Sequence, residues 1–99
     1  MEYRSKFQDE SIDQLFRAIL ELRNIEECYR FFEDICTINE IQSLAQRLEV
    51  AKMLREKYTY QEIAQKTHAS TATISRVNRC LNYGANGYNI ILDRLDAKK

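Results

Sequence analysis

Apolar residues recur every three or four positions along the first part of the chain, which is the spacing of one face of an α-helix. One stripe, over residues 12–20, predicts a first helix that ends near Arg23. A second stripe, over residues 25–36, predicts a second helix. Asn24 with Glu27 three residues later is typical of a capped helix start, so a short break should separate the two helices.

A longer pattern without a helix-breaking residue predicts a third helix from about Ile38 to Lys57. At 1.5 Å per residue this helix would be about 30 Å long. One apolar face of this helix consists of Ile41, Leu44, Ala45, Leu48, Ala51 and Leu54. Val50 and Met53 lie off that stripe, which leaves apolar surface on more than one side of the helix. In so short a chain this favours burial between two subunits, with a compact monomeric bundle as the alternative.

The pattern then shortens into two small helices separated by a polar break. Thr59 with Glu62 is typical of a capping box and predicts a helix to about Thr67. Residues 68–69 form the break, and the next helix is expected over residues 71–82. Two short helices joined by a tight turn indicate a helix-turn-helix.

A glycine- and asparagine-rich segment follows this motif. The stretch NYGANGY, residues 82–88, contains residues that tolerate a positive φ, and it should therefore end the fifth helix and turn the chain. Apolar residues between Tyr88 and Leu95 recur at helical spacing again. They predict a last helix over residues 88–97.

The composition supports an all-α fold. The chain has 99 residues, no proline and two glycines, and it is rich in long charged side chains that suit helices. This length fits one domain whose core only just outweighs the entropy of folding. We expect a six-helix domain made of a dimerisation scaffold (residues 1–58), the helix-turn-helix (residues 59–82) and the C-terminal helix.

Cysteine usage and hydropathy place the chain in a reduced cytoplasm. Cys28, Cys36 and Cys80 are an odd set without paired spacing, and the N-terminal residues lack the apolar segment of a signal peptide. No stretch approaches the roughly 20 apolar residues that cross a bilayer, so no membrane partner is expected.

The sequence does not predict an enzyme or a metal site. Cys28 and Cys36 lack the tight spacing of zinc ligands and match the apolar stripe, so we expect both in the core together with Tyr29. The single histidine lies in the predicted turn without a placed carboxylate partner, which argues against catalysis.

The formal net charge is zero, yet the charges are unevenly distributed. Met1 to Gln42 contain ten acidic and five basic residues, whereas Ser43 to Lys99 contain five acidic and ten basic residues. Between Ile63 and Leu92 there is no carboxylate at all. One end of the molecule is therefore able to face an anion.

The acid-free stretch includes a helix start crowded with short side chains. Ser70 is the expected N-cap of the fifth helix, because its hydroxyl would accept from free N–H groups there. A helix entering the major groove of DNA presents its first residues to base edges, and short side chains permit that approach. The candidate groove-facing residues are Thr71, Ala72, Thr73 and Ser75, and the candidate backbone contacts are Gln61, Lys66, Arg76 and Arg79.

A simpler interpretation of the same residues is that they cap and solvate an ordinary helical hairpin. The turn position commonly filled by glycine is His68, which must adopt or avoid a positive φ. The internal contacts expected of the motif are nevertheless present, with Ala64 at the close approach and Ile63, Ile74 and Val77 at the crossing.

With these segments in view, the sequence resembles the Trp repressor superfamily, and most closely its YerC/YecD branch. TATISRVNRCL is similar to the recognition-helix segment of the repressor, and TINEIQSLAQR is similar to the start of its long third helix. The resemblance implies an intertwined, all-helical homodimer that binds double-stranded DNA, with two reading heads about 34 Å apart.

The resemblance also bears on small-molecule effectors. The two repressor arginines that help to hold tryptophan correspond to Arg47 and Arg76, and both are kept. Val77 stands where the repressor has a glycine beside the indole ring. This branched side chain favours another small effector, or none, over tryptophan. A salt bridge to a nearby acid is the alternative role for Arg47.

Two functions follow from these observations. The first is a sequence-specific regulator of transcription, with repression as the expected effect, that binds double-stranded DNA as a homodimer. The second is a helical protein-interaction module whose basic head contacts an acidic protein instead of a chosen DNA sequence.

Overall fold

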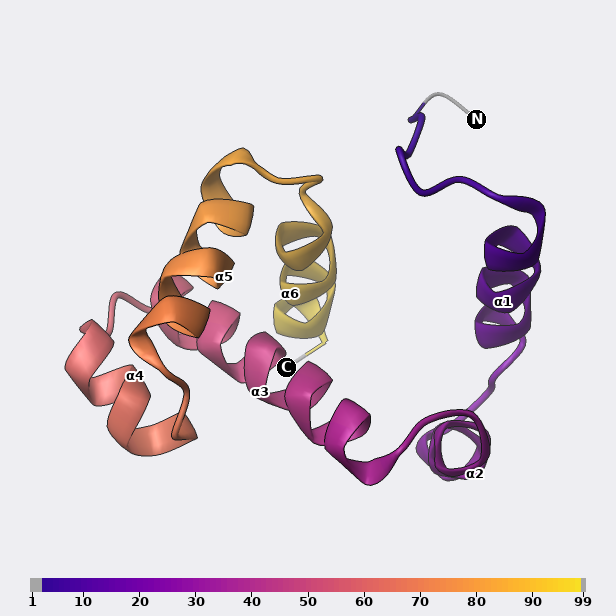
Figure 1. Cartoon of the computed structure of the whole chain (residues 1–99), viewed down its shortest axis with the longest axis horizontal. Helices are drawn as coiled ribbons and strands as arrows, with labels where there is room; N and C mark the ends of the chain where they lie inside the picture. The colour runs from indigo at the N-terminus through magenta and orange to yellow at the C-terminus, as the bar shows by residue number, and fades with distance from the viewer. Residues whose placement is uncertain (1–2, 99) are drawn as a thin grey trace. The chain divides into compact units, whose positions relative to one another are not determined.

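The computed structural model describes residues 3–98, and this part of the chain is helical without any strand (Figure 1). The helices are α1 (Glu10–Leu20), α2 (Ile25–Ile35), α3 (Ile38–Arg55), α4 (Tyr60–Thr67), α5 (Thr71–Tyr83) and α6 (Gly87–Ala97). This order confirms the predicted all-α class and six-helix fold. Within residues 3–98, no helix combines the length and apolar character that crossing a membrane would require.

Short polar residues set the starts of these helices, as their sequence positions predicted. The Asn24 side chain accepts a hydrogen bond from the Glu27 N–H at 2.9 Å and caps α2. At the start of α4 both hydrogen bonds of the capping box between Thr59 and Glu62 are present. The Thr59 hydroxyl accepts from the Glu62 N–H at 3.2 Å, and the Glu62 carboxylate accepts from the Thr59 N–H at 2.9 Å. Asp9 caps α1 in the same way. Side chains thus satisfy N–H groups that a helix cannot pair internally.

The chain forms two compact units, unit 1 (Met1–Ile38) and unit 2 (Asn39–Lys99). In unit 2, all four helices contribute to one apolar core. Its buried residues are Val50, Ala51 and Met53 of α3, Ile63 of α4, Ala69 of the turn, Ile74 and Val77 of α5 and Leu92 of α6. The helix-turn-helix is therefore packed on the C-terminal half of α3 and not merely attached to it.

The apolar stripe predicted for α3 lies only partly in the core of unit 2, where Ala51 is fully buried and Leu54 packs against the core. Val50 is fully buried and Met53 is 7% exposed, although both lie off the expected stripe. Leu44 and Leu48, which belong to that stripe, are 50% and 36% exposed. The reason is that α3 is apolar on two sides, and the helix-turn-helix packs on the side that carries Val50 and Met53. The other side keeps exposed leucines.

Unit 1 has no buried residue in either of its helices. Cys28 is exposed and Cys36 is half-buried, and Tyr29 is 64% exposed, so the prediction that they lie in a core is wrong for the described chain. Two short helices bury too little of each other's apolar stripes to close a core, because each stripe needs an opposing layer. The stripes of α1 and α2 consequently stay half-buried in part, and Phe16, Leu20 and Ile25 remain exposed.

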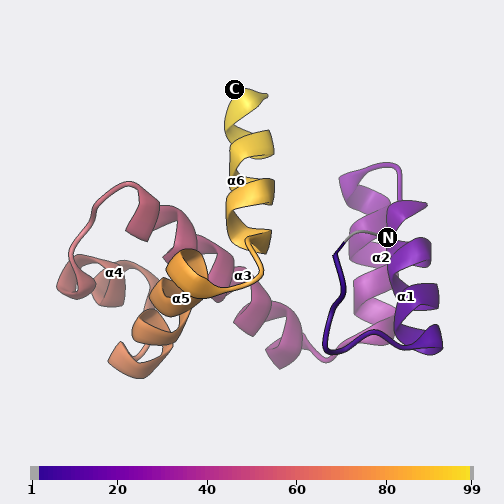
Figure 2. The same cartoon turned by 90° about the horizontal axis from the view of Figure 1, so that it is seen from above.

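Polar side chains fix the helices of unit 2 to α3. Gln46 of α3 donates from its amide to the Thr67 carbonyl at the end of α4, at 3.0 Å. Arg55 donates to the Asp93 carboxylate of α6 at 2.7 Å and to the Asn89 carbonyl at 3.3 Å. Figure 2 shows α6 rising from the side of α3 in unit 2. The first bond holds α4 against α3, and the other two hold α6 against α3.

The segment after α5 ends that helix as predicted, with the positive φ at an asparagine and a different role for Gly84. Gly84 has a φ of −88°, and it is Asn86 that takes a positive φ of 70°. A Cβ at Gly84 would lie 2.5 Å from the Cys80 carbonyl oxygen. Glycine is thus required there because the backbone approaches closely, and asparagine supplies the left-handed turn.

Candidate nucleic-acid interface

The turn between α4 and α5 is held by a small set of hydrogen bonds. His68 adopts the left-handed conformation with a φ of 61°, and its N–H donates to the Ala64 carbonyl at 2.8 Å. The Thr67 hydroxyl donates to the Ile63 carbonyl at 2.8 Å and accepts from the Ala69 N–H at 3.1 Å. Histidine tolerates this conformation, and the bonds on either side of it close the turn.

The crossing of α4 and α5 is made by the residues that the sequence indicated. Ile63 and Ile74 are fully buried and Val77 is 2% exposed, and Ala64 packs against this core. Side chains of this kind fix the angle between two helices because they are densely packed from several sides. The structure therefore confirms the helix-turn-helix contacts.

Ser70 caps α5 and also restrains a second hydroxyl. The Ser70 Oγ accepts from the Thr73 N–H at 3.1 Å, which confirms the predicted N-cap. The same hydroxyl donates to the Thr73 Oγ1 at 3.1 Å. Thr73 is half-buried, whereas Thr71 and Ala72 are exposed. In the first turn Thr71 and Ala72 are therefore exposed, whereas Thr73 is restrained by Ser70. The sequence did not predict this difference.

Exposed polar and basic residues continue along α5. Ser75, Arg76 and Arg79 are exposed, and the first turn of the helix contains no acidic residue. Neither arginine forms an ion pair with any residue in the range 3–98. Their charges are thus unopposed by a protein carboxylate, which favours an external anion.

The two candidate residues of α4 lie at opposite ends of that helix. Gln61 is exposed in the first turn of α4. Lys66 is exposed in its last turn and lines a pocket with α3 residues, among them Glu49. The structure therefore brings Thr71, Ala72, Ser75, Arg76 and Arg79 onto one helix, and it adds Gln61 and Lys66 from the helix packed against it.

Arg47 of α3 and Arg76 of α5 act on the same side chain, the phenol of Tyr88 in α6. Burial raises the pKa of Tyr88, the nearby Cys80 thiol acts in the same direction, and the positive charges of Arg47 and Arg76 oppose the shift. Arg47 makes no ion pair within the described range, so the salt-bridge alternative has no support there. The influence of these arginines on Tyr88 had no signal in the sequence, because Tyr88 fitted the apolar stripe of the last helix.

Over residues 3–98, the histidine, cysteine and carboxylate side chains nowhere gather in a group of three that could hold an ion. The geometry instead defines a helix-turn-helix protein with an exposed, unpaired basic helix.

Comparison with known proteins agrees with this class. The family model described as Trp repressor protein matches residues 10–96. YerC of Bacillus subtilis (strain 168), described as uncharacterized, is 66% identical over 90 residues, which cover 91% of this chain and 86% of that protein. The chain belongs to the Trp repressor family and, within it, to the YerC-like branch.

Solved structures show the same fold. A presumed Trp repressor from Staphylococcus aureus is 58% identical and superposes with a TM-score of 0.88, covering 92% of this chain and 91% of that one. A TrpR-like protein from Eubacterium eligens ATCC 27750 is 63% identical, with a TM-score of 0.89 and coverage of 92% and 94%. The TrpR-like fold of this chain is thus shared with two close relatives.

Proposed function

We propose that this protein is a transcription regulator that binds specific double-stranded DNA sequences as a homodimer. The observation that carries the proposal is the exposed start of α5, in a stretch from Ile63 to Leu92 without a carboxylate. Membership of the Trp repressor family supports it.

The start of α5 has the physical properties that DNA recognition needs. Backbone N–H groups and the positive end of the helix dipole favour phosphate at a helix N-terminus. Thr71 and Ala72 are short enough to reach base edges, and their methyl groups suit the methyl group of thymine. Arg76 and Arg79 would bind phosphates on either side, with Gln61 and Lys66 contributing from α4.

The exposed stripes of unit 1 support the homodimer. Phe16 is 57% exposed, Leu20 81%, Ile25 75% and Ile35 50%. Such large side chains on two consecutive helices form an apolar surface that a second copy would cover, because exposed patches of this kind mark association sites. The second copy is the occupant that family membership favours.

We propose that tryptophan is not required for DNA binding. Val77 stands where the repressor has a glycine that leaves space for the indole ring. In this chain Val77 is 2% exposed and belongs to the core. Arg47 and Arg76, the matching corepressor residues, act on Tyr88. Another small effector, or none, is therefore the expected case, and duplex affinity should be the same with and without tryptophan.

Selection of bound duplexes from a random pool by the purified protein tests the DNA proposal. A selected duplex should bind at least about 1,000-fold more tightly than random DNA, and its log affinity should fall steeply with log salt. Thr71→Ala should relax the preference at one position. Arg79→Ala should weaken all duplexes alike and lower the salt slope by about 1.

Arg17→Ala is the matched control, because Arg17 is an exposed arginine of α1 in unit 1. It should leave both affinity and preference unchanged. Equal binding of every duplex by the wild type, with Thr71→Ala and Arg79→Ala silent, would contradict the proposal and favour the protein-interaction module.

A further inference from the structure

Gln46 is a polar residue on the face of α3 that packs against the helix-turn-helix. It lies four positions before Val50 and seven before Met53, so the three residues share one side of α3. Gln46 is half-buried, and its amide donates to the Thr67 carbonyl at 3.0 Å. Thr67 is the last residue of α4, where backbone carbonyls have no partner within the helix. Gln46 therefore supplies from α3 a hydrogen bond that α4 cannot supply itself.

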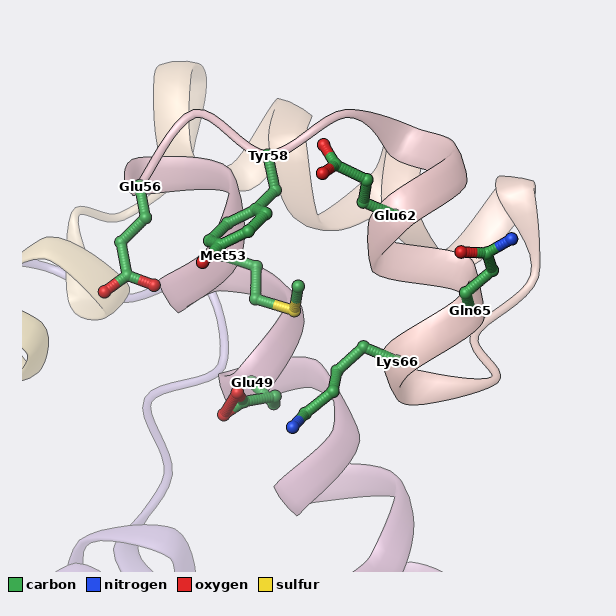
Figure 3. Close-up of a pocket in the computed structure, with 7 residues that line it drawn as sticks. All are labelled: Glu49, Met53, Glu56, Tyr58, Glu62, Gln65 and Lys66. Carbon is green, nitrogen blue, oxygen red and sulfur yellow. The ribbon is translucent and has the colours of Figure 1, made fainter.

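One side of α4 faces an open hollow instead of packing densely on α3 (Figure 3). The hollow has a volume of about 490 Å³, and its lining includes Glu49 of α3 and Lys66 of α4. Dense packing fixes two helices because it leaves no space for movement, and an open hollow lacks that effect. On this side of α4, the hydrogen bond from Gln46 consequently restrains the position of the helix relative to α3.

The carbonyl that Gln46 binds belongs to the turn that leads into α5. The Thr67 hydroxyl donates to the Ile63 carbonyl and accepts from the Ala69 N–H. Residues 68–70 alone separate Thr67 from the start of α5 at Thr71. Because this connection is short and closed by hydrogen bonds, a shift of Thr67 relative to α3 would also shift the start of α5.

The opposite end of α5 is held separately. Asn89 of α6 donates from its amide to the Leu81 carbonyl in the last turn of α5 at 3.2 Å. Arg55 of α3 in turn donates to the Asn89 carbonyl at 3.3 Å. Loss of the Gln46 hydrogen bond would thus free the start of α5 while its end stays attached to α3 through α6. The exposed start of α5 could then change direction without leaving the core.

We propose that Gln46 is a positioning residue for sequence recognition, a role that rests on the proposed binding of DNA. Its hydrogen bond to Thr67 holds the start of α5 in one direction, so that Thr71 and Ala72 meet base edges in a fixed geometry. Contacts to bases need that geometry because they are short and directional. Attraction between basic side chains and phosphates is independent of sequence and tolerates several orientations. Gln46 therefore acts on sequence preference more than on general affinity for DNA.

Gln46→Met tests this role, because methionine keeps the length of the side chain and lacks the amide donor. Affinity is measured for the duplex that the wild-type protein selects and for a random duplex at the same salt concentration. The selected duplex should bind about fivefold more weakly, the factor that one hydrogen bond of ordinary net strength represents, because DNA must then restore the orientation of α5. Affinity for the random duplex should change less than about twofold, since phosphate contacts tolerate the movement.

Gln42→Met is the matched control, because Gln42 is an exposed glutamine one turn earlier on α3. It should leave both affinities unchanged. Amide hydrogen exchange of the free protein supplies a measurement without DNA. The N–H groups of His68 and Ala69 in the turn should exchange faster in Gln46→Met than in the wild type, while that of Val77 in the core should keep its rate.

Two results would overturn the role of Gln46 alone. The first is a wild-type protein that selects a duplex together with a Gln46→Met variant that keeps the same ratio of affinities for the selected and random duplexes. A merely structural contribution would give that result, because loss of folded protein lowers both affinities alike. The second is unchanged hydrogen exchange in the turn. Equal affinity of the wild-type protein for every duplex would instead contradict the proposed function, and the role of Gln46 with it.

Discussion

The two units of this protein solve the problem of burying apolar surface in opposite ways. Unit 2 closes a core from four helices, in which Val50, Ile63 and Ile74 are fully buried. Unit 1 has equally apolar helices, and yet α1 and α2 contain no buried residue. A short amphipathic helix is stabilised mainly by the layer packed on its apolar face. The comparison teaches that the same pattern yields a core only where the fold supplies that layer.

The largest expected effect comes from breaking the core of unit 2. Ile74→Ala should lower the free energy of unfolding by about 3 kcal/mol, because it leaves a cavity where the side chain is fully buried. Denaturation at a fixed protein concentration measures the change. Ile90→Ala in α6, at 43% exposure, is the control and should cost far less. Equal losses of unfolding free energy in the two variants would contradict the placement of Ile74 in the core.

A second change tests whether unit 1 depends on a second copy. Leu20→Glu puts a charge at a position that is 81% exposed in the single chain and should weaken self-association at least about tenfold, since a buried leucine is worth about 1.5–3 kcal/mol. Sedimentation across a concentration series measures this. Gln14→Glu adds the same charge on the polar side of α1 and should leave self-association unchanged. A stable monomer of the wild-type protein at micromolar concentration would contradict the homodimer itself.

A smaller effect is expected at the start of α5. Ser70→Ala removes the cap of the helix and should cost about 1 kcal/mol of stability. It also releases the Thr73 hydroxyl, which Ser70 holds at 3.1 Å. Ser70→Asp keeps an acceptor for the free N–H groups and should recover most of the loss in thermal denaturation. If Ser70→Ala melts like the wild type, the cap contributes nothing to unit 2.

The smallest effect is a pH dependence at the start of α4. Hydrogen bonds from Thr59 lower the pKa of Glu62 below its ordinary value of 4.5. A lowered pKa in the folded state stabilises the fold above the unfolded-state pKa, and this contribution is lost as the pH falls through the lower folded value. Glu62→Gln should therefore flatten the loss of stability on acidification from neutral pH. Asp9→Asn provides the same test in unit 1, where the Asp9 pKa is lowered chiefly by the Ser11 hydroxyl. An unchanged acid profile in Glu62→Gln would exclude this contribution.

The sequence predicted the helices well because their ends depend on neighbouring residues. Asn24, Thr59 with Glu62, and Ser70 each act within three positions along the chain, and the structure confirms each of them. The contacts of Ile63 with α5 were also predictable, since the helix-turn-helix demands apolar residues at fixed places. Local spacing contains enough information for features of this kind.

Burial was harder to predict because it depends on what lies opposite a helix. α3 is apolar on two sides, and nothing within it indicates that Met53 rather than Leu48 meets the core. Cys28 matches its stripe fully and is still exposed. For the candidate interface, the sequence identified the exposed residues of α5. It contained no signal for the hydrogen bond from Ser70 to Thr73 or for the influence of two arginines on Tyr88.

The open stripes of α1 and α2 have a consequence for synthesis of the chain. These helices leave the ribosome before the last residue of the core, Leu92, has emerged. A nascent chain therefore presents Leu20 and Ile25 to its surroundings before it has a folded body. Such early segments are open to wrong contacts, and assembly beside another newly made chain would shorten that exposure.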